Sequence, residues 1–277
     1  MKRPAASSKA PAAGFSWRRV SAILLRHLYV LRRSWPRILD LAYWPTVQMV
    51  LWGFITIFFR QHSSWVAEAA AVLISAVLLW DVLFRANLAL SLSFIEEMWA
   101  RNLAQLFISP LRPYELVAAV SLMSLIRTLI GVTPAALLAL PLFDVSVFAL
   151  GLPLIAFFAN LLVLGWSVGL LVSAAVLRLG LGAENLAFVA IFAIAPLSGI
   201  YYPIETLPGW LQPIAWALPS AYVFEGMRAV LFEGEFRLDL LAGAVGLNIL
   251  HFAAAVLFFL RMVSIARRRG LLLKQGE

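Results

Sequence analysis

Six long apolar stretches run through the chain and decide what it can fold into. They cover about 39–59, 67–94, 115–140, 147–177, 184–201 and 239–261. Each approaches or exceeds the roughly 20 residues that a helix needs to cross a bilayer. Backbone N–H and C=O groups within hydrocarbon must pair with one another, which leaves only helices or closed barrels. These runs are far longer than the alternating strands of a barrel, so the sequence predicts an all-α polytopic membrane protein with six transmembrane helices.

Basic side chains gather at the two ends of the chain. Nine Lys or Arg residues precede residue 38 and five follow residue 260, whereas charged residues make up only 13% of the 277. Positive residues beside membrane spans mark the cytoplasmic side. With an even number of spans, we expect a multi-pass protein of a bacterial-type inner (plasma) membrane with both termini cytoplasmic. This placement favours anionic membrane lipids as partners of the charges and argues against nucleic acid.

Shorter segments flank the spans. Residues 1–14 are rich in Pro, Ala and Ser and are predicted to be a disordered tail. Residues 15–37 combine spaced apolar residues with six arginines, which is typical of an amphipathic helix in the cytoplasmic interface or of a helix packed on a partner subunit. The six-span domain is expected over 38–262, followed by a basic cytoplasmic tail over 263–277.

The loop between the second and third spans predicts a short amphipathic helix within 95–110. Glutamates in its first turn and Pro110 at its end are the usual signals of such a helix. It either lies on lipid headgroups or docks as a rigid body into a groove of another protein. The side chains that could make such a contact are Glu96, Glu97, Trp99, Arg101, Asn102 and Gln105.

Prolines divide the segment 202–237, after the fifth span, into short pieces. Each proline interrupts helical hydrogen bonding, so we expect two short helices that dip into the outer leaflet and return, as a broken re-entrant segment. Its aromatic rings either anchor it at the membrane interface or gate an exit path. The candidate residues are Tyr201, Tyr202, Pro203, Glu205, Pro208, Trp210, Glu225 and Arg228.

Three charged residues fall inside predicted spans: Asp81, Arg85 and Arg127. Asp81 and Arg85 are four residues apart and share one helix face. Arg127 is expected at a similar depth on the next, antiparallel helix. Because an unpaired charge in a bilayer is costly, Asp81 is predicted to pair with Arg85, Arg127 or both. The network either pins helices together or contacts a transported molecule.

The chemistry that the chain lacks narrows the function. A phosphate-binding P-loop ends in Gly-Lys-Ser/Thr, yet the lysines are Lys2, Lys9 and Lys274, and none follows a glycine. The three histidines are scattered and cysteine is absent, so no metal site or catalytic residue is predicted. We therefore expect a protein that is not an enzyme and carries no cofactor of its own.

The outer segment resembles the signature of the ABC-2 family of exporter permeases. Its Pro-x-Ser-Gly, Tyr-Pro, Leu-Pro and Glu-Gly-x-Arg elements appear in that order within 196–228, and Ser109-Pro110-Leu111-Arg112 resembles part of the family's coupling segment. The span number, the topology and the amphipathic N-terminal helix extend the likeness along nearly the whole chain. One departure is that many members carry an Arg-Glu-x-Gly-Thr-like run where this chain reads Met98-Trp99-Ala100-Arg101-Asn102.

The resemblance implies a division of labour between subunits. A cytoplasmic ABC ATPase subunit would hold ATP and Mg and contact the segment 95–110. Two permease subunits, identical or different, would form the export path for an amphipathic or glycan-bearing substrate, such as a polysaccharide, glycolipid, lipid or drug. The alternative is an ion-coupled secondary transporter that works without an ATPase partner and relies on buried acidic groups such as Asp81.

Overall fold

The computed structural model describes residues 14–60, 64–100 and 102–269, and the regular structure in these ranges is entirely helical. The α-helices are α1 (Trp17–Arg33), α2 (Trp35–Arg60), α3 (Ser64–Trp99), α4 (Leu103–Ile108), α5 (Pro113–Phe143), α6 (Leu152–Leu179), α7 (Leu186–Ile194), α8 (Gln212–Trp216), α9 (Pro219–Arg228) and α10 (Leu238–Arg269). Short 3-10 turns at Val147–Leu150, Leu181–Ala183, Ala195–Leu197 and Ile204–Thr206 and a π-helical turn at Ala229–Glu233 join them. The all-α prediction is confirmed.

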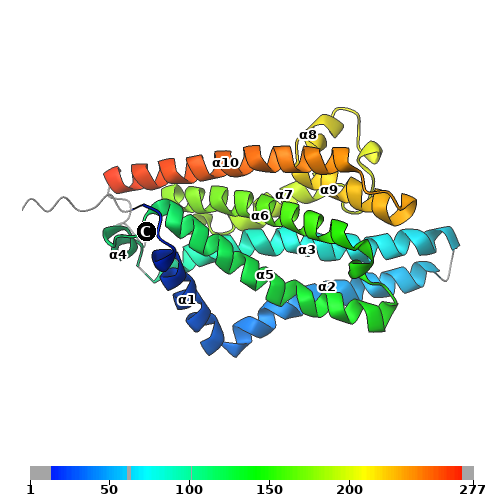
Figure 1. Ribbon diagram of the computed structural model, residues 1–277, viewed down its shortest axis with the longest axis horizontal. Coiled ribbons are helices and arrows are strands. Elements are labelled where there is room, and N and C mark those ends of the chain that lie inside the picture. The colour runs from blue at the N-terminus through cyan, green and yellow to red at the C-terminus, as the bar shows by residue number, and fades with distance from the viewer. Residues whose placement is uncertain (1–13, 61–63, 101, 270–277) are drawn as a thin grey trace, which may run out of the picture.

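Five of the helices in the described ranges are long and apolar enough to cross a membrane: Trp35–Phe58, Val72–Trp99, Pro113–Phe143, Leu152–Leu179 and Leu238–Arg269. The chain is therefore a polytopic membrane protein. The long helices lie side by side, and α3 packs against α2, α5 and α6 (Figure 1). One end of the bundle carries α1 and α4, and we call it the α4 end. The opposite end carries α8 and α9, and we call it the α8 end.

Glycines bring α3 and α6 into close contact at the centre of the bundle. A Cβ atom on Gly165 of α6 would lie 2.5 Å from the Ala86 Cβ and 2.8 Å from the Leu83 carbonyl oxygen of α3. Small residues permit such approaches between membrane helices, where packing replaces the hydrophobic effect as the main attraction. Between other elements, the Asn87 amide donates to the Ala187 carbonyl at 2.9 Å, and the Asn248 amide donates to the Asn160 side-chain oxygen at 2.8 Å.

The fifth predicted span, 184–201, is shorter than expected. It consists of α7 and the 3-10 turn that follows, which together form an apolar segment over Leu186–Leu197. Pro196 lies within this turn, where it interrupts the helical hydrogen-bond pattern. The segment falls short of the roughly 20 residues of a standard span. The count of six spans therefore stays a prediction.

The helix ends differ from three of the predicted boundaries. The helix expected over 15–37 is divided at Ser34 into α1 and the start of α2. The short helix expected within 95–110 does not begin at Glu96, because α3 contains no proline or glycine and continues to Trp99; only α4 is separate. The tail expected over 263–277 begins as helix, since α10 continues to Arg269. The predicted disordered tail lies outside the described residues except for Gly14.

Candidate functional site

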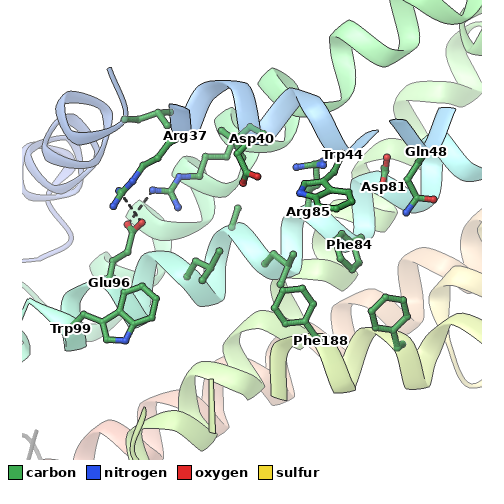
Figure 2. A pocket seen from close by; sticks show the side chains of 17 residues that line it. Arg37, Asp40, Trp44, Gln48, Asp81, Phe84, Arg85, Glu96, Trp99 and Phe188 are labelled. Carbon is green, nitrogen blue, oxygen red and sulfur yellow. Dashed lines mark hydrogen bonds and ion pairs between the residues drawn. The ribbon is translucent and has the colours of Figure 1, made fainter. Parts of the chain in front are cut away.

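A cleft of about 640 Å³ opens between α2, α3 and α7, and α1 and α5 each add one residue to its lining (Figure 2). This volume lies in the range of pockets that bind small molecules. Its apolar lining comes mainly from aromatic and aliphatic side chains of α2, α3 and α7: Leu31, Leu41, Trp44, Phe84, Leu88, Ala89, Leu92, Trp99, Phe188 and Phe192. Its polar lining consists of Arg37, Asp40, Gln48, Asp81, Arg85, Glu96 and Arg127.

The three charged residues that were predicted inside spans all line this cleft. Asp81 is 3% exposed and Arg85 is 8% exposed. In the described part of the chain no ion pair within 4.0 Å joins Asp81 to Arg85 or to Arg127, so the predicted direct pairing was wrong. The Arg85 side chain instead lies beside Gly131 of α5, where a Cβ atom would come within 2.9 Å of the Arg85 Cδ. Among the described residues, the Asp81 Oδ2 and the Arg85 Nε have no hydrogen-bond partner.

Arg127 reaches along the bundle to Glu96. The residues that flank it on α5 lie beside the middle of α3: the Ser124 hydroxyl donates to the Ala86 carbonyl at 2.8 Å, and Gly131 contacts Arg85. The guanidinium, however, binds Glu96 near the end of α3, with Nη2 and Oε2 3.2 Å apart. A long side chain that carries its charge toward the end of a helix follows the usual behaviour of arginine at membrane depth.

Glu96 joins three elements at the mouth of the cleft. Its Oε1 lies 3.2 Å from the Arg37 Nη1 in the first turn of α2, and its Oε2 binds Arg127 of α5. Figure 2 shows both interactions converging on the one carboxylate. The carboxylate is therefore shared between two cations within the chain. The predicted role of Glu96 as a contact for an ATPase stays a prediction.

Glu97, the next residue, fixes α1 and the loop after α3. It is 3% exposed, and its Oε2 accepts hydrogen bonds from Arg26 at 2.9 Å and from the Asn102 amide at 2.8 Å. The buried ring of His27 lies 3.6 Å from its other oxygen. Burial lowers the pKa of His27, while the neighbouring Glu97 acts in the opposite direction. Glu97 and Asn102 thus bond within the chain, and their contact with a partner stays a prediction.

Glu115 binds the N-terminal end of α1, and this role was not predicted from the sequence. Its carboxylate accepts hydrogen bonds from the Arg19 guanidinium at 2.8 and 2.6 Å and from the Ser16 backbone N–H at 2.9 Å. It also accepts the Arg112 backbone N–H at 3.0 Å and so fixes the start of α5. A Pro two residues before a Glu signals a helix start, but this signal does not reveal a partner on α1.

Two of the remaining candidates near α4 are exposed, and one of them, Trp99, also lines the cleft. Trp99 is 53% exposed and Gln105 is exposed, while Arg101 lies outside the described residues. The end of α4 forms a compact turn, since the Ser109 hydroxyl donates to the Leu106 carbonyl at 2.6 Å. The exposed surface available to a partner at the α4 end therefore includes Trp99 and Gln105.

At the α8 end, four residues form a compact polar cluster that we call the Glu225–Arg228 cluster. The Glu225 carboxylate accepts the Ile204 backbone N–H at 2.8 Å and pairs with Arg228 at 2.7 Å. Arg228 also donates to the Gly199 carbonyl at 2.7 Å. Gly199 has a φ of +66°, and a Cβ there would lie 2.8 Å from Ile204. The Glu-Gly-x-Arg and Pro-x-Ser-Gly elements, distant in sequence, thus meet in space.

The other candidates of the segment 202–237 surround this cluster. Tyr201 stacks on Trp52 of α2 with ring centroids 5.0 Å apart, and the Tyr202 hydroxyl donates to the Pro196 carbonyl at 2.7 Å. Pro203 precedes the 3-10 turn Ile204–Thr206. Glu205, Pro208 and Trp210 are exposed. The two expected short helices are present as α8 and α9, and their depth in a membrane stays a prediction.

Comparison with known proteins identifies one family. Residues 20–232 match the model of the ABC-2 type transporter family, which covers the bundle from α1 to the π-helical turn after α9. A search of curated proteins found no match to the chain.

Proposed function

Because the chain belongs to the ABC-2 type transporter family, of which it is a permease subunit, we propose that it forms the export path for an amphipathic or glycan-bearing substrate and is driven by a separate ATPase subunit. The substrate classes that fit are a polysaccharide, a glycolipid, a lipid or a drug. The observation that carries the proposal is the cleft between α2, α3 and α7, which offers aromatic walls and charged groups within apolar helices. Polar groups inside membrane helices mark the paths of transported molecules.

The α4 end is proposed to face the cytoplasm and the ATPase. The N-terminal helix and the C-terminal end of α10, with their basic residues, lie at this end (Figure 1). Ion pairs of Glu96, Glu97 and Glu115 join α1, α2, α3 and α5 there. A push on α4 would therefore reach the helices that line the cleft. ATP and Mg would be held by the partner, and a second permease subunit, identical or different, would complete the path.

Purification from native membranes tests the ATPase partner. We expect a nucleotide-binding protein and ATPase activity to co-elute with the chain. Trp99→Ala combined with Gln105→Ala removes exposed side chains at the α4 end and is expected to weaken the complex. Phe232→Ala, which truncates a similarly exposed ring at the α8 end, is the matched control and is expected to leave it intact.

Reconstitution distinguishes the proposal from its alternative. ATP-dependent movement of an amphiphile by the complex would support it. Transport by the lone chain, driven by a proton or sodium gradient and unaffected by ATP, would identify an ion-coupled secondary transporter instead. That alternative draws on one observation, the unpartnered Asp81 oxygen in the cleft.

A further inference from the structure

We propose that the cleft selects a zwitterionic amphiphile, with a cationic amine of the head at Asp81 and an anionic group of the same head at Arg85. This inference rests on the proposed function, because it names the class of molecule that the path accepts. The two groups lie on one face of α3 and both line the cleft.

The first argument is that both charged groups lack the partners that burial demands. Asp81 and Arg85 are each more than nine-tenths buried, and no ion pair in the described residues satisfies either of them. The Asp81 Oδ2 and the Arg85 Nε also lack any hydrogen-bond partner in the part of the chain that the structure describes. A buried polar atom without a hydrogen-bond partner is costly, and a ligand that supplies the missing partners removes this cost.

The second argument is the balance of charge. The lining contains three arginines and three carboxylates, and Glu96 already binds Arg37 and Arg127. The remaining arginine, Arg85, lies among Asp40 and Asp81, which both influence it electrostatically. A head with a single negative charge would bind Arg85 next to two carboxylates, and a head with a single positive charge would bind Asp81 next to a guanidinium. Only a head that carries both charges finds a complement to each.

The third argument concerns the spacing of the two charged residues and the aromatic lining of the cleft. Asp81 and Arg85 lie about one turn apart on α3, where four residues rise about 6 Å, and both line the same cleft. Aromatic side chains line the same cleft, among them Trp44, Phe84 and Phe192. Aromatic faces attract cationic amines, and their apolar area accommodates a hydrocarbon body. The cleft is therefore complementary to a dipolar head on an apolar body.

Binding of three probes to the full chain in a nonionic detergent tests the proposal. The probes share one brominated dodecyl chain and differ in the head: a phosphate joined to a quaternary amine, a phosphate alone, or a quaternary amine alone. Bromine quenches tryptophan fluorescence, and Trp44→Phe combined with Trp99→Phe identifies the part of the signal that comes from the cleft. We expect the zwitterionic probe to bind about tenfold or more tightly than either singly charged probe.

Two variants are expected to change the ranking in opposite directions. Asp81→Asn should weaken binding of the zwitterionic probe about tenfold to a hundredfold. Of the two singly charged probes, the phosphate probe should then bind more tightly. Arg85→Gln should weaken binding of the zwitterionic probe by a similar factor. Of the two singly charged probes, the quaternary amine should then bind more tightly. Glu235→Gln and Arg268→Gln, which neutralise exposed charges elsewhere, are the matched controls. If Arg85→Gln fails to purify as a folded protein, Arg85→Lys keeps the charge and should keep the wild-type ranking.

Two results would overturn the inference. Equal binding of all three probes by the wild type would show that the cleft does not distinguish between the headgroups. An equal loss for all three probes in both variants would show that Asp81 and Arg85 only support the structure. The assay contains neither ATP nor a partner, so its outcome is separate from co-elution of an ATPase, which tests the proposed function alone.

Discussion

Replacement of Glu225 by alanine is expected to release the loop at the α8 end without unfolding the bundle. Its carboxylate accepts the Ile204 N–H at 2.8 Å and pairs with Arg228 at 2.7 Å. A hydrogen bond to a charged group contributes about 1.5–3 kcal/mol, and a partly exposed ion pair adds about 0.2–1 kcal/mol. The free energy of local opening should therefore fall by about 2–4 kcal/mol. This corresponds to roughly 30-fold to 700-fold faster hydrogen exchange at the Ile204 amide.

Hydrogen-exchange mass spectrometry on peptides that contain Ile204 measures this change. Glu225→Gln keeps one oxygen that can accept the amide, so its exchange rate should lie between those of the wild type and Glu225→Ala. Glu205→Ala removes an exposed carboxylate next to the same amide and should leave the rate unchanged. Unchanged exchange in Glu225→Ala would refute the reasoning, because the loop would then be held by other contacts.

Three further changes test the packing. Gly165→Ala places a Cβ 2.8 Å from the Leu83 carbonyl and forces α3 and α6 apart, so the free energy of unfolding should fall by about 1–3 kcal/mol in a denaturant titration; an unchanged midpoint would contradict this. Asn248→Leu removes the bond to Asn160 and should cost only about 0.6 kcal/mol in the same titration, and a loss above about 2 kcal/mol would show a larger role. Burial lowers the pKa of His27, so the folded state binds fewer protons than the unfolded state; its stabilising contribution is complete above the ordinary value of 6.5 and is lost as the pH falls below it. Thermal melts between pH 8 and 5 should show this decline, and His27→Gln should flatten it; parallel curves would disprove the effect.

The membrane fold could be predicted because it depends on the local property of apolar length. The helices around 39–59, 115–140, 147–177 and 239–261 are each present, with ends that differ by several residues. The fifth apolar stretch shows the limit of this signal. Its composition is as apolar as that of the others, but Pro196 converts its end into a 3-10 turn. Apolar composition alone does not determine how long a helix remains regular.

The site could be predicted only in part, because its partners are distant in sequence. Asp81, Arg85 and Arg127 were found as charges inside apolar stretches, and all three line one cleft. Their pairing was wrong because it assumed that a side chain bonds at the level of its own Cα, whereas the Arg127 guanidinium extends to Glu96. That acid was assigned to a contact with an ATPase because adjacent glutamates resemble a helix start. No local pattern indicates that arginines before the first span neutralise them.

The ion pairs of α1 join segments that are synthesised far apart in time. Glu115 follows Arg19 by 96 residues, and Glu97 follows Arg26 by 71. At about 5–20 residues per second, the carboxylate for Arg19 is synthesised roughly 5–20 seconds after the arginine itself. During this interval, the basic and aromatic surface of α1 is free to lie on the headgroups of the bilayer. Because α1 leaves the ribosome before its partners, it reaches its final position only after the beginning of α5 has been synthesised, so assembly of the α4 end waits for Glu115.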